Sequence, residues 1–371
     1  MRNKVAFFAF PACLLVLLTL NAQASNTDEA RFDLPQPNGC YLVGTTTVVL
    51  KDLHRTRDLL VTVWYPAAAG KGDLAPYMDK KTADAVAEDW ELWPDFERQV
   101  RTHAKLLAPV AEGGPFPVVL LEHGSNLVPA TYSVLAEGLA SSGFIVVATN
   151  HPPDSLIAIL PDGHESKFTP YWPAKADRHT QGMAIGKFAE DVLIADVRFV
   201  LDRLQEMNLH DGFWRGRLEM SRVGIVGHSV GGTTAGLATK EEARVLAGVN
   251  LDGSTYPGMN DDVRPIALNK PFLFLVTPEH ASNPGAKVRE FAGSASNSYY
   301  VVVDGADHMS FTDKRLIVSR LSRKAKPDDR AFQHALLKLE LTRSLVEEFF
   351  GKYLQDGTAP SLDVTVRVDK K

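Results

Sequence analysis

Short apolar runs recur along the chain and predict the strands of a β-sheet. Two early runs are rich in β-forming residues, and the short charged connection between them predicts an antiparallel hairpin. Six later runs are buried-strand candidates, and those at 118–121 and 144–148 are continuously apolar, as expected for parallel strands that are covered on both faces. The expected strands cover residues 44–50, 59–65, 118–121, 144–148, 223–226, 246–251, 272–276 and 299–303.

Apolar residues at helical spacing between and after these runs predict the helices that cover the sheet. The later strands alternate with helices or long connections, which is typical of an α/β-hydrolase fold. We therefore predict an α/β protein with an eight-stranded, mostly parallel sheet and helices on both faces. The expected helices cover residues 130–141, 187–207, 233–244 and 331–354.

Three stretches depart from this alternation of strands and helices. Residues 66–114 show no strand pattern, but they contain an amphipathic helix from Ala83 to Trp93, so we predict a helical insertion there. The other face of this helix is acidic, which favours packing on the core over contact with an anionic lipid surface; contact of the protein with a membrane stays open. Residues 152–186 predict a long loop near the site, and the basic residues 314–330 predict a solvated loop.

The N-terminus has the pattern of a signal peptide. Two basic residues precede an apolar run from Val5 to Leu20, and Ala22-Gln23-Ala24 follows as a cleavage site. The run is shorter than the roughly 20 residues that a membrane-spanning helix needs. We expect residues 1–24 to be removed, residues 25–371 to form one hydrolase domain, and the protein to be secreted or periplasmic.

Charge and cysteine content exclude some classes of protein. Residues 1–24 carry two basic side chains and no acidic one, so their removal changes the formal net charge from −5 to −7. This acidic balance argues against a nucleic-acid partner. Only Cys40 remains after cleavage, so the mature chain can form no internal disulfide.

The strongest chemical motif is the G-x-S-x-G pentapeptide from Gly227 to Gly231. It follows an expected strand and precedes an expected helix, which is the context of a nucleophile elbow. An ordinary glycine-rich turn is the alternative, but the context favours Ser229 as a nucleophile whose hydroxyl lies exposed at the tip of the turn.

A serine hydroxyl needs a base, and the base needs a carboxylate that orients it. In this fold the order along the chain is serine, acid, histidine. His308 is the favoured base because it follows the last expected strand, whereas His280 comes early and His334 lies inside a helix. For the acid, Asp252 and Glu279 both follow strands, and Asp307 adjoins the histidine.

We expect the oxyanion hole to use the backbone N–H groups of Val230 and of Ser125, in the loop after the first parallel strand. His123 and His151 also lie at expected strand ends, which raises the question of a metal site. No tight ligand spacing supports one. We therefore predict no metal and no cofactor, with both histidines shaping the rim of the site.

Six segments together resemble the type II platelet-activating-factor acetylhydrolases, a family of α/β hydrolases. The family places its acid shortly after the strand that follows the elbow, so the resemblance implies Asp252 as the acid, beside Ser229 and His308. The chain departs from the family pattern at Ser125, Asn126 and Val230. The segments are VTVWYPA (61–67), PVVLLEHG (117–124), YSVLAEGLASSGFIVVATNH (132–151), RVGIVGHSVGG (222–232), LDG (251–253) and HMSFTD (308–313).

These features predict a secreted serine carboxylic-ester hydrolase that forms an acyl-enzyme on Ser229. Small or lipid esters with short acyl chains are the expected substrates, including phospholipids like platelet-activating factor, so lipid degradation is an expected role. One alternative is a polyester or lactone hydrolase with the same triad. The other is a non-catalytic binding protein on a hydrolase scaffold, against which the order of the three residue types argues.

Overall fold

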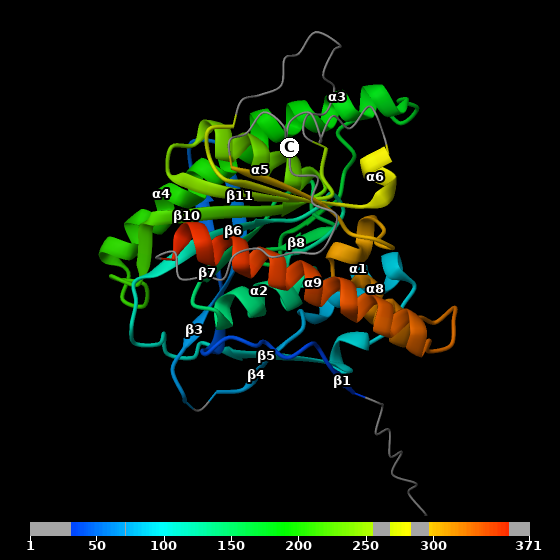
Figure 1. Cartoon of the computed structure of the whole chain (residues 1–371), viewed down its shortest axis with the longest axis horizontal. Helices are drawn as coiled ribbons and strands as arrows, with labels where there is room; N and C mark the ends of the chain where they lie inside the picture. Colours follow the sequence, from blue (N-terminus) through cyan, green and yellow to red (C-terminus); the bar gives the residue numbers. More distant parts are fainter. Residues whose placement is uncertain (1–30, 71, 255–267, 283–296, 356–371) are drawn as a thin grey trace, which may run out of the picture. The chain divides into compact units, whose positions relative to one another are not determined.

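The computed structural model describes residues 31–70, 72–254, 268–282 and 297–355, with the side chains of residues 178 and 179 left out. The expected signal peptide lies outside these residues. The main sheet has eleven strands in the order β1-β5-β2-β3-β7-β6-β10-β11-β12-β13, with β4 paired to β5 (Figure 1). Its strands are β1 (Phe32–Asp33), β2 (Leu42–Asp52), β3 (Arg57–Ala67), β4 (Leu74–Pro76), β5 (Val100–Leu106), β6 (Phe116–Glu122), β7 (Ile145–Asn150), β10 (Leu218–His228), β11 (Val245–Leu251), β12 (Phe272–Val276) and β13 (Ser298–Val302).

The eight expected strands all occur, and they form the contiguous path from β2 to β13. β2 and β3 pair antiparallel as a hairpin, β3 pairs antiparallel with β7, and the strands from β7 onward are parallel. The predicted number of eight strands is wrong for the described residues, because β1, β4 and β5 extend the sheet beyond β2. These edge strands are two, three and seven residues long, too short or too polar to show an apolar run.

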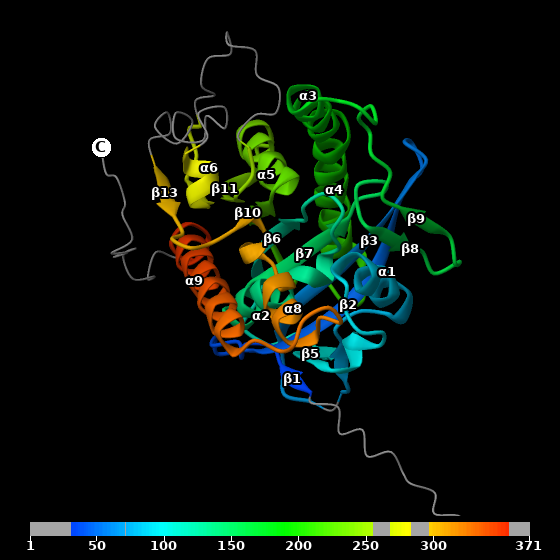
Figure 2. The ribbon, with the colours of Figure 1, turned by 90° about the vertical axis from the view of Figure 1, so that its right-hand side faces the viewer.

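Helices cover both faces of the sheet (Figures 1 and 2). Alternate residues of one strand point to opposite faces, and β6 shows this directly: Val119 and Leu121 join one apolar cluster, while Val118 and Leu120 join another. The first cluster packs under α1 (Lys80–Trp90), α2 (Ser133–Ser141), α8 (Lys314–Leu321) and α9 (Asp329–Leu354). The second packs under α4 (Ile194–His210) and α5 (Val230–Glu241).

Two stretches that we expected to be loops contain regular structure. Residues 152–186 include a small hairpin of β8 (Ile157–Ile159) and β9 (Glu165–Lys167) and most of α3 (Arg178–Phe188). The single helix expected at 187–207 is α3 followed by a π-helical turn (Ala189–Leu193) and α4. The basic stretch at 314–330 begins with α8, whose Leu316 and Ile317 are buried. The apolar periodicity of these segments is too short or too interrupted for the sequence to show it.

The insertion at 66–114 contains the expected helix α1, which Asp79 caps by accepting a hydrogen bond from the Thr82 N–H. Its apolar side chains Ala83, Val86, Ala87 and Trp90 are buried in the core. The apolar face of α1 therefore packs on the protein itself. The insertion is not purely helical, because β4 and β5 lie within it.

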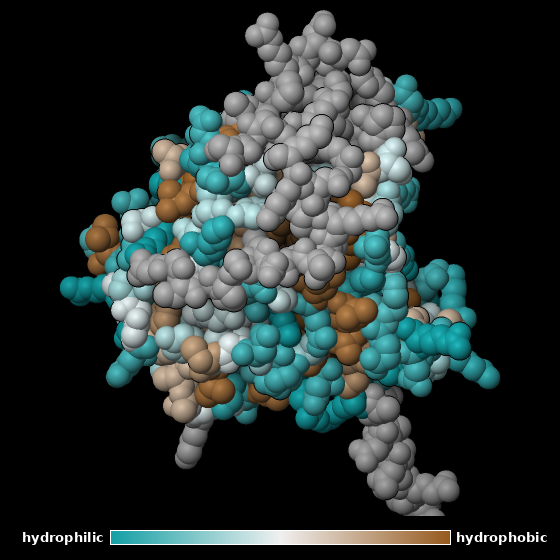
Figure 3. Space-filling view, in the orientation of Figure 1, coloured by the Kyte–Doolittle hydropathy of each residue, from teal (hydrophilic) through white to brown (hydrophobic). Residues whose placement is uncertain are grey.

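The surface of the described residues is mostly polar on the face shown in Figure 3, where apolar residues form small groups. Large apolar side chains that are exposed, such as Leu53, Trp93 and Leu209, come from separate elements. In the part of the chain that the structure describes, every helix is too short or too polar to cross a lipid bilayer.

A buried ionic network joins the C-terminal ends of β6 and β7 to α4. The two ring nitrogens of His151 lie 2.6 Å from a Glu122 oxygen and 2.9 Å from an Asp196 oxygen. Arg57 also binds Asp196, with a nitrogen to oxygen distance of 2.8 Å. Burial alone would lower the pKa of His151, but the two carboxylates outweigh it and raise this pKa to about 9. His151 is therefore a charged imidazolium inside the protein.

This network predicts a loss of stability at alkaline pH. The pKa of His151 is higher in the folded chain than its ordinary value near 6.5, so its contribution is complete below pH 6.5 and is lost as pH rises through about 9. We expect the free energy of unfolding to fall by on the order of 3 kcal/mol over this window, measured by urea denaturation.

His151→Gln should lower stability and remove this alkaline loss, because the titrating group is gone. His210→Gln changes an exposed histidine of α4 and should keep the loss. A flat wild-type profile between pH 6.5 and 9.5 would contradict the charged state of His151, even if His151→Gln did not fold.

Candidate active site

Ser229 occupies the turn between β10 and α5, in the strand-turn-helix context that the sequence predicts. Its backbone has φ 56° and ψ −120°, a conformation that is strained for a residue with a side chain. A Cβ at Gly227 would lie 2.0 Å from the Gly231 oxygen, and a Cβ at Gly231 would lie 2.2 Å from the Glu122 oxygen. Both glycines are therefore required for β10, α5 and β6 to approach this closely.

The register of the parallel strands gathers the loops that follow them. Gly227 pairs with Glu122, and His228 pairs with Leu251. The Ser229 N–H donates to the Leu251 carbonyl at 3.0 Å, so the turn adjoins the loop that begins at Asp252. The carboxyl ends of β6, β10 and β11 therefore bring residues 123–126, 229 and 252 to one edge of the sheet.

Asp252 and His308 are directly bonded. His308 Nδ1 lies 2.7 Å from Asp252 Oδ2. The other carboxylate oxygen accepts from the Thr277 N–H at 2.7 Å and lies 3.1 Å from His280 Nδ1. Burial would raise the pKa of Asp252, but the hydrogen bonds from His280, His308 and Thr277 outweigh it and hold this pKa well below its usual range. Asp252 is thus an ionised carboxylate, and it holds an imidazole whose side chain is 48% exposed.

The other candidates for the acid lie elsewhere. Glu279 is exposed on α6 (Pro278–Ser282), and its carboxylate has no hydrogen bond to a described residue. Asp307 caps the short helix that begins at His308 and pairs with Arg315 at 2.7 Å. Of the three carboxylates left open by the strand pattern, the structure brings only Asp252 to His308.

The Ser229 hydroxyl makes no hydrogen bond to any described residue and is partly exposed. In unliganded enzymes such hydrogen bonds are often long and form only in the substrate complex. The ring centroids of His228 and His308 lie 4.6 Å apart, and His228 directly precedes Ser229, so the His308 loop is packed against the Ser229 turn.

The loop after β6 approaches the same turn. A Cβ on Gly124 would lie 3.2 Å from the Ser229 Cβ. The Gly124 N–H donates to the Tyr132 hydroxyl at 2.9 Å, and the Asn126 N–H donates to the Asp154 carbonyl at 2.8 Å. Within the described residues the intervening Ser125 N–H has no hydrogen-bond partner. Val230 begins α5, so its N–H is one of those that the helix leaves unpaired.

Several residues at this edge were not predicted. Tyr132 and His228 are buried between the loops, Thr277 and His280 hold Asp252, and Asp154 holds the Ser125 side chain with an oxygen to oxygen distance of 2.5 Å. His280, which the sequence offers as an alternative base, is instead a partner of Asp252. Tyr132 and His228 lie in segments that carry the family resemblance, but the sequence does not show these contacts, because the partners are distant in the chain.

His123 and His151 do not lie at the rim as expected, since both are buried. Burial lowers the pKa of His123 to about 3, so its ring is neutral, whereas His151 is charged. Within the described ranges, no group of three or more His, Cys, Asp or Glu side chains could hold a metal ion.

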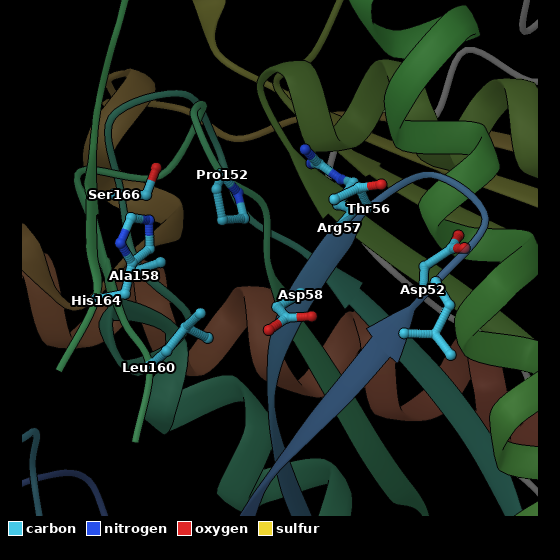
Figure 4. Close-up of a pocket in the computed structure, with 10 residues that line it drawn as sticks. Asp52, Thr56, Arg57, Asp58, Pro152, Ala158, Leu160, His164 and Ser166 are labelled. Carbon is cyan, nitrogen blue, oxygen red and sulfur yellow. The ribbon is translucent and has the colours of Figure 1, made fainter. Parts of the chain in front are cut away.

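Two pockets lie away from these residues. One of about 400 Å³ opens between the β2–β3 hairpin and the β8–β9 hairpin, where Arg57, Asp58 and His164 line it (Figure 4). Another of about 490 Å³ lies under the insertion, where Trp64 and Tyr77 line it. Neither is lined by Ser229, Asp252 or His308, so hydrogen-bond geometry rather than cavity size identifies the candidate active site.

Two family models match parts of the chain. Platelet-activating factor acetylhydrolase, isoform II, matches residues 195–341, and chlorophyllase matches residues 96–162. A platelet-activating factor acetylhydrolase from Cavia porcellus is 24% identical over 86% of this chain and 78% of its own length. A probable 1-alkyl-2-acetylglycerophosphocholine esterase from Arthroderma benhamiae is 25% identical over 66% of this chain and 64% of its own length.

A solved structure is similar over nearly the whole chain. A ferulic acid esterase from Streptomyces cinnamoneus matches with a TM-score of 0.76 and 28% identity, covering 92% of this chain and 100% of that one. The matching proteins are ester hydrolases, and the fold agrees with them. The chain therefore has the α/β-hydrolase fold, it is similar to the type II platelet-activating-factor acetylhydrolases, and it is an ester hydrolase.

Proposed function

We propose that the protein is a serine carboxylic-ester hydrolase in which Ser229 is the nucleophile, His308 the general base and Asp252 the residue that orients it. The observation that carries this proposal is the 2.7 Å bond between His308 Nδ1 and Asp252 beside the strained turn of Ser229. This bond fixes the proton on Nδ1 and leaves Nε2 free to take the hydroxyl proton of Ser229.

The reaction then follows two steps. Ser229 attacks the ester carbonyl, its proton passes to His308, and the alcohol leaves with that proton as the acyl-enzyme forms. Water then attacks the acyl group while His308 takes its proton and returns one to Ser229. The N–H groups of Ser125 and Val230 stabilise the oxyanion; the free state of the Ser125 N–H, between two occupied neighbours, supports this role.

Short-acyl esters, including phospholipids like platelet-activating factor, are the substrates that we propose, on the basis of the acetylhydrolase relatives. Esters of aromatic acids such as ferulic acid are a second candidate, favoured by the similarity to the feruloyl esterase. We further propose export, directed by residues 1–24.

Replacement of the nucleophile tests the mechanism. Ser229→Ala should lower kcat for p-nitrophenyl acetate by at least about 10⁴-fold, because no acyl-enzyme can form. The melting temperature should change little. Ser221→Ala changes an exposed serine of β10 and should keep full activity. A fluorophosphonate should label the wild-type protein at Ser229, as mapped by mass spectrometry; an unlabelled Ser229 would instead favour a non-catalytic binding protein.

The oxyanion loop can be tested through Gly124. A Cβ there would lie 2.9 Å from His228 Nδ1, so Gly124→Ala must displace the loop and its donor. We expect kcat to fall about 10- to 100-fold with a smaller change in KM. Gly236→Ala is the matched control, because no atom lies within 4 Å of its added Cβ in α5; it should keep kcat and gain about 0.5–1 kcal/mol of stability. Equal kcat values for the two variants would refute the placement of this loop.

A substrate panel distinguishes the proposed ester classes. Purified protein would be assayed with p-nitrophenyl esters of increasing chain length, a 2-acetyl phospholipid and methyl ferulate. The acetylhydrolase assignment predicts that kcat/KM is highest for acetyl esters and falls at least tenfold by an eight-carbon acyl chain. Preference for methyl ferulate would support the second candidate, and preference for long chains would contradict both.

A further inference from the structure

A chain of hydrogen bonds links the three loops of the candidate active site. The Gly124 N–H, in the loop after β6, lies 2.9 Å from the Tyr132 hydroxyl oxygen. The same hydroxyl lies 2.9 Å from His228 Nδ1, and His228 Nε2 lies 2.8 Å from the backbone carbonyl of His308. The chain therefore runs from the oxyanion loop through the nucleophile turn to the His308 loop.

The chemistry of the end groups sets the direction of the first and the last of these three bonds. A carbonyl oxygen cannot donate, so His228 Nε2 must carry a proton and donate it to His308. An amide N–H cannot accept, so the Tyr132 oxygen accepts from Gly124 and has its own proton left to donate. A neutral His228 ring has its single proton on Nε2 and accepts the Tyr132 proton at Nδ1, whereas a charged ring would donate from both nitrogens.

Burial agrees with this assignment. Tyr132 and His228 are each 1% exposed. Burial is the largest cause that lowers the pKa of His228, and the charges of the nearby His308 and the more distant His123 lower it further. The charge of Asp252 acts in the opposite direction, and the resulting pKa is about 3. A neutral ring at this place adds no positive charge that would oppose protonation of His308 during the reaction.

We propose that Tyr132 and His228 are positioning residues that hold the oxyanion loop and the His308 backbone in register with Ser229. This inference rests on the proposed function, because it assumes that these three loops act together. Neither side chain contacts the reacting atoms; each fixes the placement of a group that does. A loop displaced by 1 Å can cost about 100-fold in rate, which is the scale on which such positioning acts.

Tyr132→Phe removes one hydroxyl and leaves the Gly124 N–H and His228 Nδ1 without partners. We expect kcat for p-nitrophenyl acetate to fall about 10- to 100-fold, with KM within about threefold. Tyr65→Phe is the matched control: Tyr65 is also buried, and its hydroxyl donates to the Ala108 carbonyl at 2.8 Å, away from the site. It should lose comparable stability and keep kcat within about twofold. If Tyr132→Phe matched Tyr65→Phe in kcat, the proposal would be overturned.

Variants of His228 separate positioning from packing. His228→Gln keeps a donor near the place of Nε2, whereas His228→Leu removes it at similar volume. We expect the Gln variant to retain about tenfold more activity than the Leu variant. Equal activity would show that the bond to the His308 carbonyl has no role in positioning.

Nitrogen-15 NMR of labelled histidine gives a readout that does not depend on turnover. The His228 ring should remain neutral with its proton on Nε2 from pH 5 to 9 in the wild type. A charged ring or a proton on Nδ1 would overturn the chain of bonds. Fluorophosphonate labelling of Ser229 is measured on the same samples, so failure of the proposed function appears as lost wild-type labelling, separately from the NMR result.

Discussion

Backbone contact at the nucleophile turn is the constraint on which the rest of the site depends. A Cβ on Gly227, Gly231 or Gly253 would lie 2.0–2.2 Å from a backbone oxygen of a neighbouring segment. Three chain segments can therefore meet only because these positions carry no side chain. The same contact forces Ser229 into its strained conformation, and the strain is sustained because the strands on either side are paired in register.

Partners, rather than burial alone, decide the charge of the histidines near this turn. His151 and His228 are equally buried, yet their pKa values are about 9 and about 3. His151 lies between two carboxylates, whereas His228 lies between a phenol and a carbonyl. The positive charge of His151 is thus stabilised by the carboxylates of Glu122 and Asp196, whereas the His228 ring, beside His308, stays neutral. This separation lets His308, bound to the ionised Asp252, be the ring that gains a proton during the proposed reaction.

The sequence predicts the central fold well because buried parallel strands are continuous apolar runs, and all eight expected strands occur. The sequence does not predict the edge strands β1, β4 and β5, because these strands form through pairing with their neighbours and have no apolar run of their own. The elbow has a local signature, but the proposed acid does not: Asp252 and Glu279 both follow strands, and in the sequence only the resemblance to a family favours Asp252. Tyr132 and His228 are 96 residues apart, so no pattern in the sequence could connect them.

The loop after β6, which we propose to supply an oxyanion donor, is held by one buried residue, Asp154. The Ser125 hydroxyl donates to the Asp154 carboxylate, and the Asp154 backbone carbonyl also accepts the Asn126 N–H. Asp154 is buried, which raises its pKa, and Tyr171 shares the same carboxylate oxygen. One residue thus holds the loop through both side chain and backbone. Because Asp154 and Tyr171 both come from residues 152–186, a substitution in that segment can alter the placement of the Ser125 N–H without contacting it.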